Sequence, residues 1–96
     1  MTETLSPIAL DAIALDQCPL GRPAHIAAID WSQLTEDQAR RLREMGFDEG
    51  VIVELLHKGP WGGDPLACMV GRMTVAIRRE LASAIKVIPL AEGVAA

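Results

Sequence analysis

Aromatic and basic residues are scarce in this sequence. It contains no tyrosine, one phenylalanine and two tryptophans, and nine Lys or Arg are set against thirteen Asp or Glu, which gives a formal net charge of −4 at pH 7. A domain that binds nucleic acid usually shows a basic face together with aromatic side chains on which bases stack. We therefore predict that nucleic acid is not a partner of this chain.

Cysteines and long apolar runs are also few. The two cysteines, Cys18 and Cys68, form no CxxC pair, which is typical of buried thiols in a reducing compartment. The first fifteen residues carry Glu3 and Asp11 but no Lys or Arg, unlike a signal peptide. No apolar run reaches the ~18–20 residues of a membrane helix. These absences predict a cytoplasmic protein without direct membrane insertion.

The chain has enough apolar residues to fold as one domain without disulfides or a metal. Hydrophobic residues make up 50% of its 96 residues, and a chain of this length supports a single core. Its two ends are poorly patterned, as terminal segments often are. We expect a partly flexible N-terminal arm over residues 1–14, one folded domain over 15–89, and a flexible tail over 90–96.

One helix is predicted over Glu36–Met45. Thr35 and Gln38 stand at the spacing of a capping box, in which each side chain binds the backbone N–H of the other residue. Gly46 follows at the position where a left-handed residue ends a helix, and Phe47 is placed to contact the last turn. Two i,i+4 ion pairs are expected on the helix surface: Glu36–Arg40 and Asp37–Arg41.

The remaining pattern indicates a mainly β fold. Glycines that favour tight turns separate the apolar segments: Gly21, Gly46, Gly50 and Gly71. Short alternating or β-branched runs predict five strands: Ala24–Ile29, Val51–His57, Leu66–Val70, Met73–Arg78 and Ile85–Ile88. Gly59–Pro65 is predicted to be a loop because it is rich in Gly and Pro, and Arg79–Ala84 a short helical turn. Five short strands and one helix suggest a small barrel.

The order of these motifs resembles the FeoA family. The resemblance runs from Leu15 to Val87 and rests on these stretches: Leu20-Gly21-x-x-Ala24-x-Ile26, Arg41-Leu42-x-x-Met45-Gly46-Phe47-x-x-Gly50, Gly63-Asp64-Pro65, Val70-Gly71, Val75-Ala76-Ile77-Arg78 and Ala82-x-x-Ile85-x-Val87. It implies a small SH3-like β-barrel with one inserted α-helix and a short helical turn near the C-terminus.

The resemblance also implies a function. It suggests a non-enzymatic accessory protein of ferrous-iron uptake that contacts the cytoplasmic, GTPase-containing part of the FeoB transporter and modulates its GTPase activity. Two alternatives stay open: a detached regulatory domain that modulates a metal-responsive transcriptional repressor, and a chaperone that delivers ferrous ion. An exposed edge strand would also allow a homodimer.

No catalytic constellation is visible in the sequence. Gly59–Gly63 is glycine-rich, but it joins two predicted strands and does not open a helix, so it lacks the N-terminal dipole that holds phosphate. Nucleophile elbows, HExxH and P-loop motifs are missing. We therefore expect no enzymatic activity of the chain's own.

Metal ligands are scattered. His25 and His57 stand apart from each other and from Cys18 and Cys68, whereas structural zinc needs four ligands at compact spacing. We assign no metal site and expect no required cofactor. A surface histidine or carboxylate can still take up a divalent ion such as zinc adventitiously.

Four residues are candidates for partner binding: Trp31, Trp61, Arg72 and Arg79. Aromatic anchors are enriched at protein interfaces, although Trp61 has the alternative of folding back as a lid over the barrel. An arginine can neutralise charge at the phosphoryl group in a GTPase partner. The commoner use of a surface arginine is a solvated ion pair, and the sequence leaves both readings open.

Overall fold

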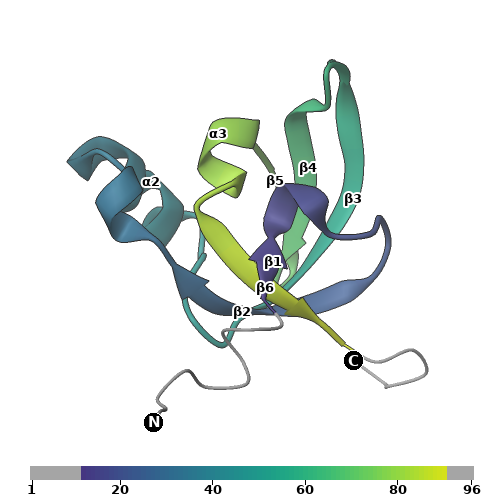
Figure 1. Ribbon diagram of the computed structural model, residues 1–96, viewed down its shortest axis with the longest axis horizontal. Helices are drawn as coiled ribbons and strands as arrows, with labels where there is room; N and C mark the ends of the chain where they lie inside the picture. The colour runs from purple at the N-terminus through teal and green to yellow at the C-terminus, as the bar shows by residue number, and fades with distance from the viewer. Residues whose placement is uncertain (1–11, 91–96) are drawn as a thin grey trace, which may run out of the picture.

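Six strands form one antiparallel sheet in the computed structural model, which describes residues 12–90 (Figure 1). The strands are β1 (Ile13–Ala14), β2 (Pro23–Ile29), β3 (Ile52–Trp61), β4 (Asp64–Val70), β5 (Met73–Ile77) and β6 (Ile85–Pro89). Their order across the sheet is β1-β6-β2-β3-β4-β5. The sheet curls around its apolar face, but within the described residues no ladder joins β1 to β5, so the barrel is open.

Four short helical segments connect the strands: η1 (Leu15–Gln17), η2 (Trp31–Gln33), α2 (Glu36–Glu44) and α3 (Arg79–Ala82). The predictions of a mainly β fold, one inserted helix and a helical turn near the C-terminus are confirmed. The sheet has one strand more than the predicted five. This is β1, whose Ile13 pairs with Val87 of β6.

Two residues assigned to the N-terminal arm thus belong to the sheet. Ile13 is half-buried and packs against the core, and this apolar contact together with the ladder to β6 accounts for the short strand. The rest of the predicted arm up to residue 11, and the predicted tail from residue 91 onward, lie outside the described residues.

Helix α2 begins at the predicted residue and ends at Glu44, one residue before the predicted end, with Met45 as its C-cap. The Gln38 amide donates to the Thr35 hydroxyl at 3.1 Å, and the Thr35 amide donates to the Gln38 side-chain oxygen at 2.9 Å, which completes the capping box. At the other end Gly46 has a φ of +96°. The Phe47 amide donates to the carbonyl of Leu42 at 3.0 Å, as a Schellman motif requires.

The ion pair on α2 differs from the two that were predicted. Arg40 Nη2 lies 2.7 Å from Asp37 Oδ1, an i,i+3 spacing, and neither i,i+4 pair forms within residues 12–90. Residues three apart also share a helix face, so Asp37 has Arg40 and Arg41 on neighbouring positions, and it pairs with Arg40. Both side chains of the pair are exposed, and such pairs add little stability.

The predicted loop over Gly59–Pro65 is wrong. β3 continues to Trp61 and β4 starts at Asp64, so the turn is only Gly62 and Gly63, with φ of +65° and +85°. The ladder shifts register between Lys58 and Trp61. Pro60 sits in that irregularity, where its missing N–H removes no ladder bond.

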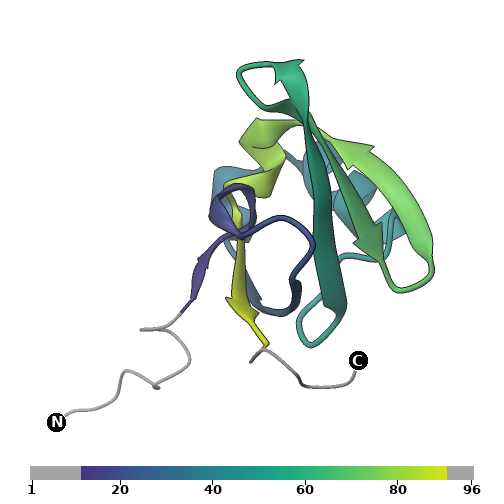
Figure 2. The ribbon, with the colours of Figure 1, turned by 90° about the vertical axis from the view of Figure 1, so that its right-hand side faces the viewer.

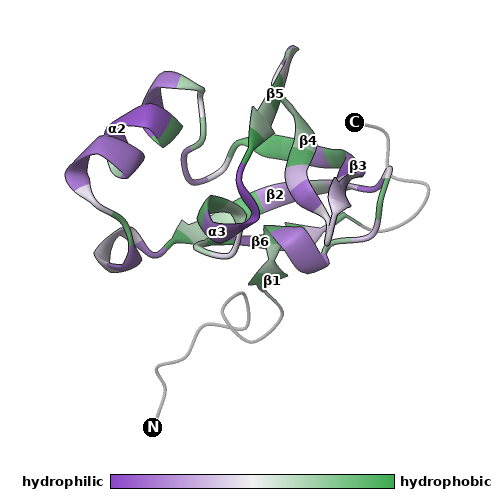
Figure 3. Cartoon of the chain, turned by 90° about the horizontal axis from the view of Figure 1, so that it is seen from above, coloured by the Kyte–Doolittle hydropathy of each residue, from purple (hydrophilic) through white to green (hydrophobic). Residues whose placement is uncertain are grey.

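The core lies inside the curl of the sheet. Apolar side chains from β2, β3, β4 and β6 meet there, and α2 and the segment after it contribute Leu42 and Phe47. Hydropathy colouring shows long apolar stretches in β4 and β5, whereas α2 is mainly polar with a few apolar residues (Figure 3). The largest fully buried side chains are Phe47, Leu15, Ile26, Leu42, Leu55, Leu66, Ile85, Val53, Val87 and Cys68.

Gly59 permits the close approach of the two hairpin strands. A Cβ placed at Gly59 would lie 2.5 Å from the backbone oxygen of Asp64, closer than real Cβ atoms come to such an atom. We predict that Gly59→Ala lowers the free energy of unfolding by about 1–3 kcal/mol, because a backbone must shift to admit the methyl group. Chemical denaturation measures this.

Gly62→Asn is the matched control for that experiment. A Cβ at Gly62 meets nothing within 4 Å, and Asn tolerates positive φ better than other residues do. Equal stability of Gly59→Ala and the parent protein would show that the two strands do not approach as closely as the structure has them.

Candidate interaction surface

Trp61 stands at the end of the β3–β4 hairpin. The residue is 79% exposed to solvent. The alternative prediction, that Trp61 folds back as a lid over the barrel, is therefore wrong. A shallow hollow of about 280 Å³ lies beside it and is lined by Trp61, Asp64, Pro65 and Arg78. The hairpin therefore presents a large aromatic side chain to solvent next to a carboxylate and a guanidinium.

Trp31 lies elsewhere. It begins η2, is half-buried, and packs against the core, while the Arg43 guanidinium carbon lies 4.4 Å from the centre of its ring. That distance is typical of a cation–π contact. The elements η2 and α2 follow each other, and α2 and the β3–β4 hairpin lie on opposite sides of the molecule in two views (Figures 1 and 3). The two tryptophans thus do not form one patch.

Arg79 connects three elements near the base of the hairpin turn. Its Nη1 donates to the carbonyl of Gly62 at 2.8 Å, and its Nε donates to Asp16 Oδ2 at 3.3 Å. Its backbone N–H donates to Asp64 Oδ1 at 3.0 Å. These bonds join α3 to η1 and to the hairpin, and the guanidinium of Arg79 makes two of them.

Arg72 lies at the opposite end of β5 from Arg79. It follows Gly71 in the two-residue turn between β4 and β5, and it is exposed. The length of β5 separates the two arginines, so they form no common cluster. Of the four predicted binding residues, Trp61 and Arg79 lie at the same hairpin turn, where Arg79 binds the carbonyl of Gly62 next to Trp61, whereas Trp31 and Arg72 lie in other parts of the molecule.

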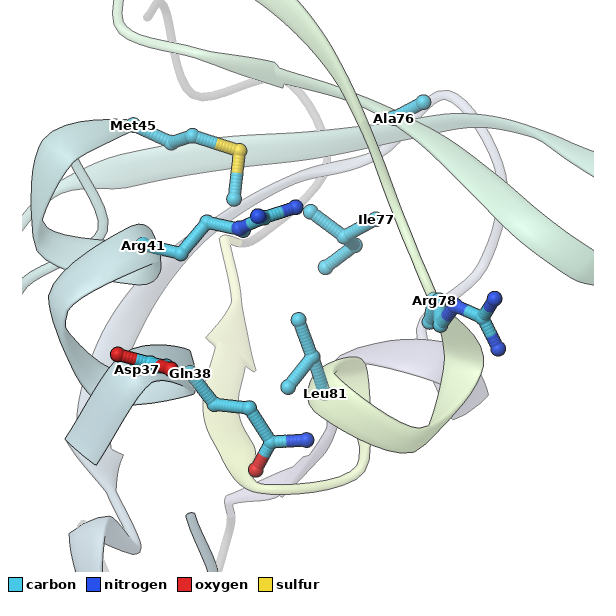
Figure 4. Close-up of a pocket in the computed structure, with 8 residues that line it drawn as sticks. All are labelled: Asp37, Gln38, Arg41, Met45, Ala76, Ile77, Arg78 and Leu81. Carbon is cyan, nitrogen blue, oxygen red and sulfur yellow. The ribbon is translucent and has the colours of Figure 1, made fainter. Parts of the chain in front are cut away.

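A groove opens between α2 and the end of β5 (Figure 4). Its volume is about 330 Å³, and its walls are Asp37, Gln38, Arg41, Met45, Ala76, Ile77, Arg78 and Leu81. The Arg41 guanidinium extends across it toward Ile77, with the Met45 sulfur beside it (Figure 4). The groove thus combines an apolar floor with a cationic side chain.

Asp16 is a buried carboxylate that sequence reasoning missed. Its residue surface is 7% exposed, and it lines a second hollow of about 260 Å³ with Lys58 and Arg79. Oδ2 accepts from Gln17 and Arg79 at 3.3 Å each, whereas Oδ1 has no hydrogen-bond partner within the described residues. Nothing in the local sequence distinguishes Asp16 from a surface residue, because its burial comes from α3 and the hairpin.

The predicted metal-ligand candidates stay apart. His25 lies in β2 and His57 in β3, while Cys18 and Cys68 are buried free thiols. Within residues 12–90, no three His, Cys, Asp or Glu side chains gather closely enough to hold an ion. In the same part of the chain, no helix is long and apolar enough to cross a membrane.

Both thiols are held in their neutral form by burial. Burial raises the pKa of Cys68 from 9.0 to about 11. It also raises the pKa of Cys18, against a smaller opposing effect of the Arg22 charge. Since the thiolate is the form that acts as a nucleophile or metal ligand, neither cysteine is activated for these reactions near pH 7.

The open, curled sheet with its single inserted helix is an SH3-like fold. A crystal structure of FeoA from Stenotrophomonas maltophilia complexed with zinc, described as a prokaryotic SH3 domain protein, has a TM-score of 0.67 to this chain at 37% identity, over 79% of this chain and 89% of that one. The pattern of the FeoA domain matches residues 13–89. The chain therefore belongs to the FeoA family.

Other solved structures agree. FeoA from Chlorobium tepidum has a TM-score of 0.72 at 28% identity, over 84% of this chain and 75% of that one. Iron(II) transport protein A from Clostridium thermocellum has a TM-score of 0.72 at 27% identity over 81% of this chain, which spans 46% of that protein. None of the curated proteins matches the chain. Membership of the family implies a role related to ferrous-iron transport.

The same fold occurs inside larger proteins. A manganese-dependent transcriptional repressor has a TM-score of 0.72 at 22% identity, over 82% of this chain but only 42% of the repressor. At that identity the likeness shows the fold alone.

We predict that Arg79→Ala lowers the free energy of unfolding by about 1–3 kcal/mol, because the buried Asp16 loses its cationic donor. Arg79→Lys should recover only part of this, since an ammonium cannot donate to Gly62 and Asp16 as a fork does. Arg72→Ala is the control and should change stability by less than about 0.5 kcal/mol. Equal stabilities of the Arg72 and Arg79 variants in urea would contradict the connecting role.

A second prediction concerns alkaline pH. Between about pH 9 and 11 the unfolded chain loses the Cys68 proton while the folded chain keeps it. The free energy of unfolding should therefore fall as pH rises through this window, by up to about 1.4 kcal/mol per pH unit, and should change little from this cause below about pH 8. The control is Cys68→Ala. Its free energy of unfolding should fall less steeply with pH in this window than that of the parent protein. Identical slopes would refute the burial effect.

Proposed function

We propose that this chain is a non-enzymatic accessory protein of ferrous-iron uptake that acts by contact with the cytoplasmic, GTPase-containing part of a FeoB-type transporter. The observation that carries the proposal is the FeoA domain match over residues 13–89. The S. maltophilia relative is itself described as a candidate activating factor of bacterial ferrous-iron transport. The protein acts in the cytoplasm, where that part of the transporter lies.

The surface of the domain supports binding more than catalysis. The hollows near Trp61 and between α2 and β5 are open at the surface, and they are lined by an exposed tryptophan and arginines. Such side chains are common anchors of protein interfaces. The buried carboxylate of Asp16, which lies beside a hollow, is bound by Arg79, and this contact supports a structural role for it.

A role as a regulatory domain for a metal-responsive repressor is the second candidate. It is favoured by the shared fold with the manganese-dependent repressor. The chain would then act on a repressor instead of a transporter, and co-purification with the repressor in place of the transporter fragment would distinguish the two.

The proposal predicts measurable binding to the purified cytoplasmic part of the FeoB encoded in the same genome. Trp61→Ala should weaken that binding by at least about tenfold, since truncation of an exposed aromatic anchor often costs ~2 kcal/mol. Leu20→Ala is the matched control, because Leu20 is also an exposed large apolar residue, at 54%. Calorimetry or biolayer interferometry measures both.

Absence of binding by the parent protein would refute the contact. Binding that Trp61→Ala and Leu20→Ala leave equally unchanged would remove Trp61 from the interface. GTP turnover of the FeoB fragment with Arg72→Ala protein tests the arginine directly. Full stimulation by this variant would exclude Arg72 as a group that acts on the phosphoryl transfer.

A further inference from the structure

Strand β5 is a free edge of the sheet. It pairs with β4 on one side, and within residues 12–90 no strand pairs with its other side. Figure 2 shows β5 at the outer margin of the sheet, where it leads into α3. An unpaired edge presents backbone N–H and C=O groups that can pair with another strand.

The register identifies which groups are free. Val70 pairs with Met73 across a two-residue turn, and the pairs Cys68–Val75 and Leu66–Ile77 follow at alternate positions. In an antiparallel hairpin of this kind these are the hydrogen-bonded pairs. The N–H and C=O of Thr74 and Ala76 therefore point away from β4, toward the open side.

The two ends of β5 carry like charges. Arg72 precedes and Arg78 follows five uncharged residues. Neither guanidinium has a hydrogen-bond or ion-pair partner among residues 12–90. If β5 of a second copy added antiparallel about Val75, each Arg72 would face an Arg78, which is unfavourable. A strand with a carboxylate at each end would place opposite charges there instead.

The groove beside β5 adds to this preference. Arg41 reaches from α2 toward Ile77 (Figure 4) and has no ion-pair partner in the described part of the chain. Asp37 also lines the groove, but Arg40 holds its carboxylate. Arg78 lines both this groove and the hollow beside Trp61. An extended segment on β5 would thus run past a cationic surface on a chain whose net charge is −4.

We propose that the outer edge of β5, with the adjoining α2 groove, binds an extended segment of a partner protein by strand addition, and that this segment carries acidic residues at both ends. This rests on the proposed function only for which protein supplies the segment. Backbone pairing with Thr74 and Ala76 holds the strand, and Arg72 and Arg78 select its charge. Strand addition to an exposed edge is a known mode of peptide recognition.

The test uses the full chain and the peptide acetyl-Glu-Val-Thr-Val-Thr-Val-Glu-amide as probe. Opposite β5 it places a glutamate at each arginine and a valine beside Met73, Val75 and Ile77. We expect the amides of Thr74 and Ala76 to exchange more slowly with solvent on titration, whereas those of Val75 and Ile77, already bonded to β4, change little. The same peptide with lysine at both ends should bind at least about tenfold more weakly.

Two pairs of variants distinguish the contribution of backbone hydrogen bonds to peptide binding from the contribution of charge. Ala76→Pro removes an outward N–H without removing a β4 bond and should abolish binding, while Ala76→Ser keeps the N–H and should retain it. Thermal melts establish that Ala76→Pro is folded; if it is not, N-methylation of the peptide's central valine tests the same bonds. Arg41→Gln should weaken binding, and Arg43→Gln, whose guanidinium lies over Trp31 outside the groove, should not.

Several results would overturn the inference. Equal binding of the acidic and lysine peptides would remove the charge selection, and binding unaffected by Ala76→Pro would remove strand addition. Self-association of the free chain that Ala76→Pro abolishes would make a second copy the occupant. No binding of the acidic peptide would leave Arg72 and Arg78 only as deterrents against edge-to-edge aggregation. None of these results bears on whether the FeoB fragment binds through Trp61.

Discussion

The position of β6 between β1 and β2 is the constraint on which the arrangement of this domain depends. Because β6 pairs with both strands, it lies inside the sheet, next to the edge strand β1, and α3 must carry the backbone there from β5 at the opposite edge. That crossing leaves β5 with a single neighbour. Arg79 holds the crossing in place through Gly62 and Asp16. One topological choice thus produces both a buried polar connection and an exposed edge.

Local signals in the sequence were sufficient for α2 and for most of the strands. The capping box at Thr35 and the Schellman end at Gly46 involve residues within one turn of each other, so their geometry is independent of the rest of the fold. The hairpin was misjudged for the opposite reason. Gly59 and Pro60 predict a loop by composition, but their strand conformation depends on the approach of Asp64 from β4, a contact that composition does not reveal.

The candidate surface was less predictable than the fold. The exposure of Trp61 follows from its place at the tip of a long hairpin, and the sequence left its orientation open. Asp16 is buried by α3 and the hairpin, which lie far along the chain. The groove exists because α2 lies at some distance from the end of β5. The spacing of apolar residues in the sequence does not predict the distance between two elements that are far apart in the chain. Of the two arginines that bracket β5, only Arg72 was among the predicted binding residues, and Arg78 was predicted only as part of a strand.

At an interface formed by this surface, the backbone and the side chains must have different roles. Backbone pairing along β5 contributes binding energy that depends little on the sequence of the added strand. It therefore cannot by itself make the interface specific. Selection has to come from groups at the margins: Arg72 and Arg78 at the strand ends, Arg41 in the groove and Trp61 beyond it. Positive groups on an otherwise acidic chain also speed the approach of an acidic segment while the remaining surface repels it elsewhere. A small domain can in this way be specific through an edge and the charges around it.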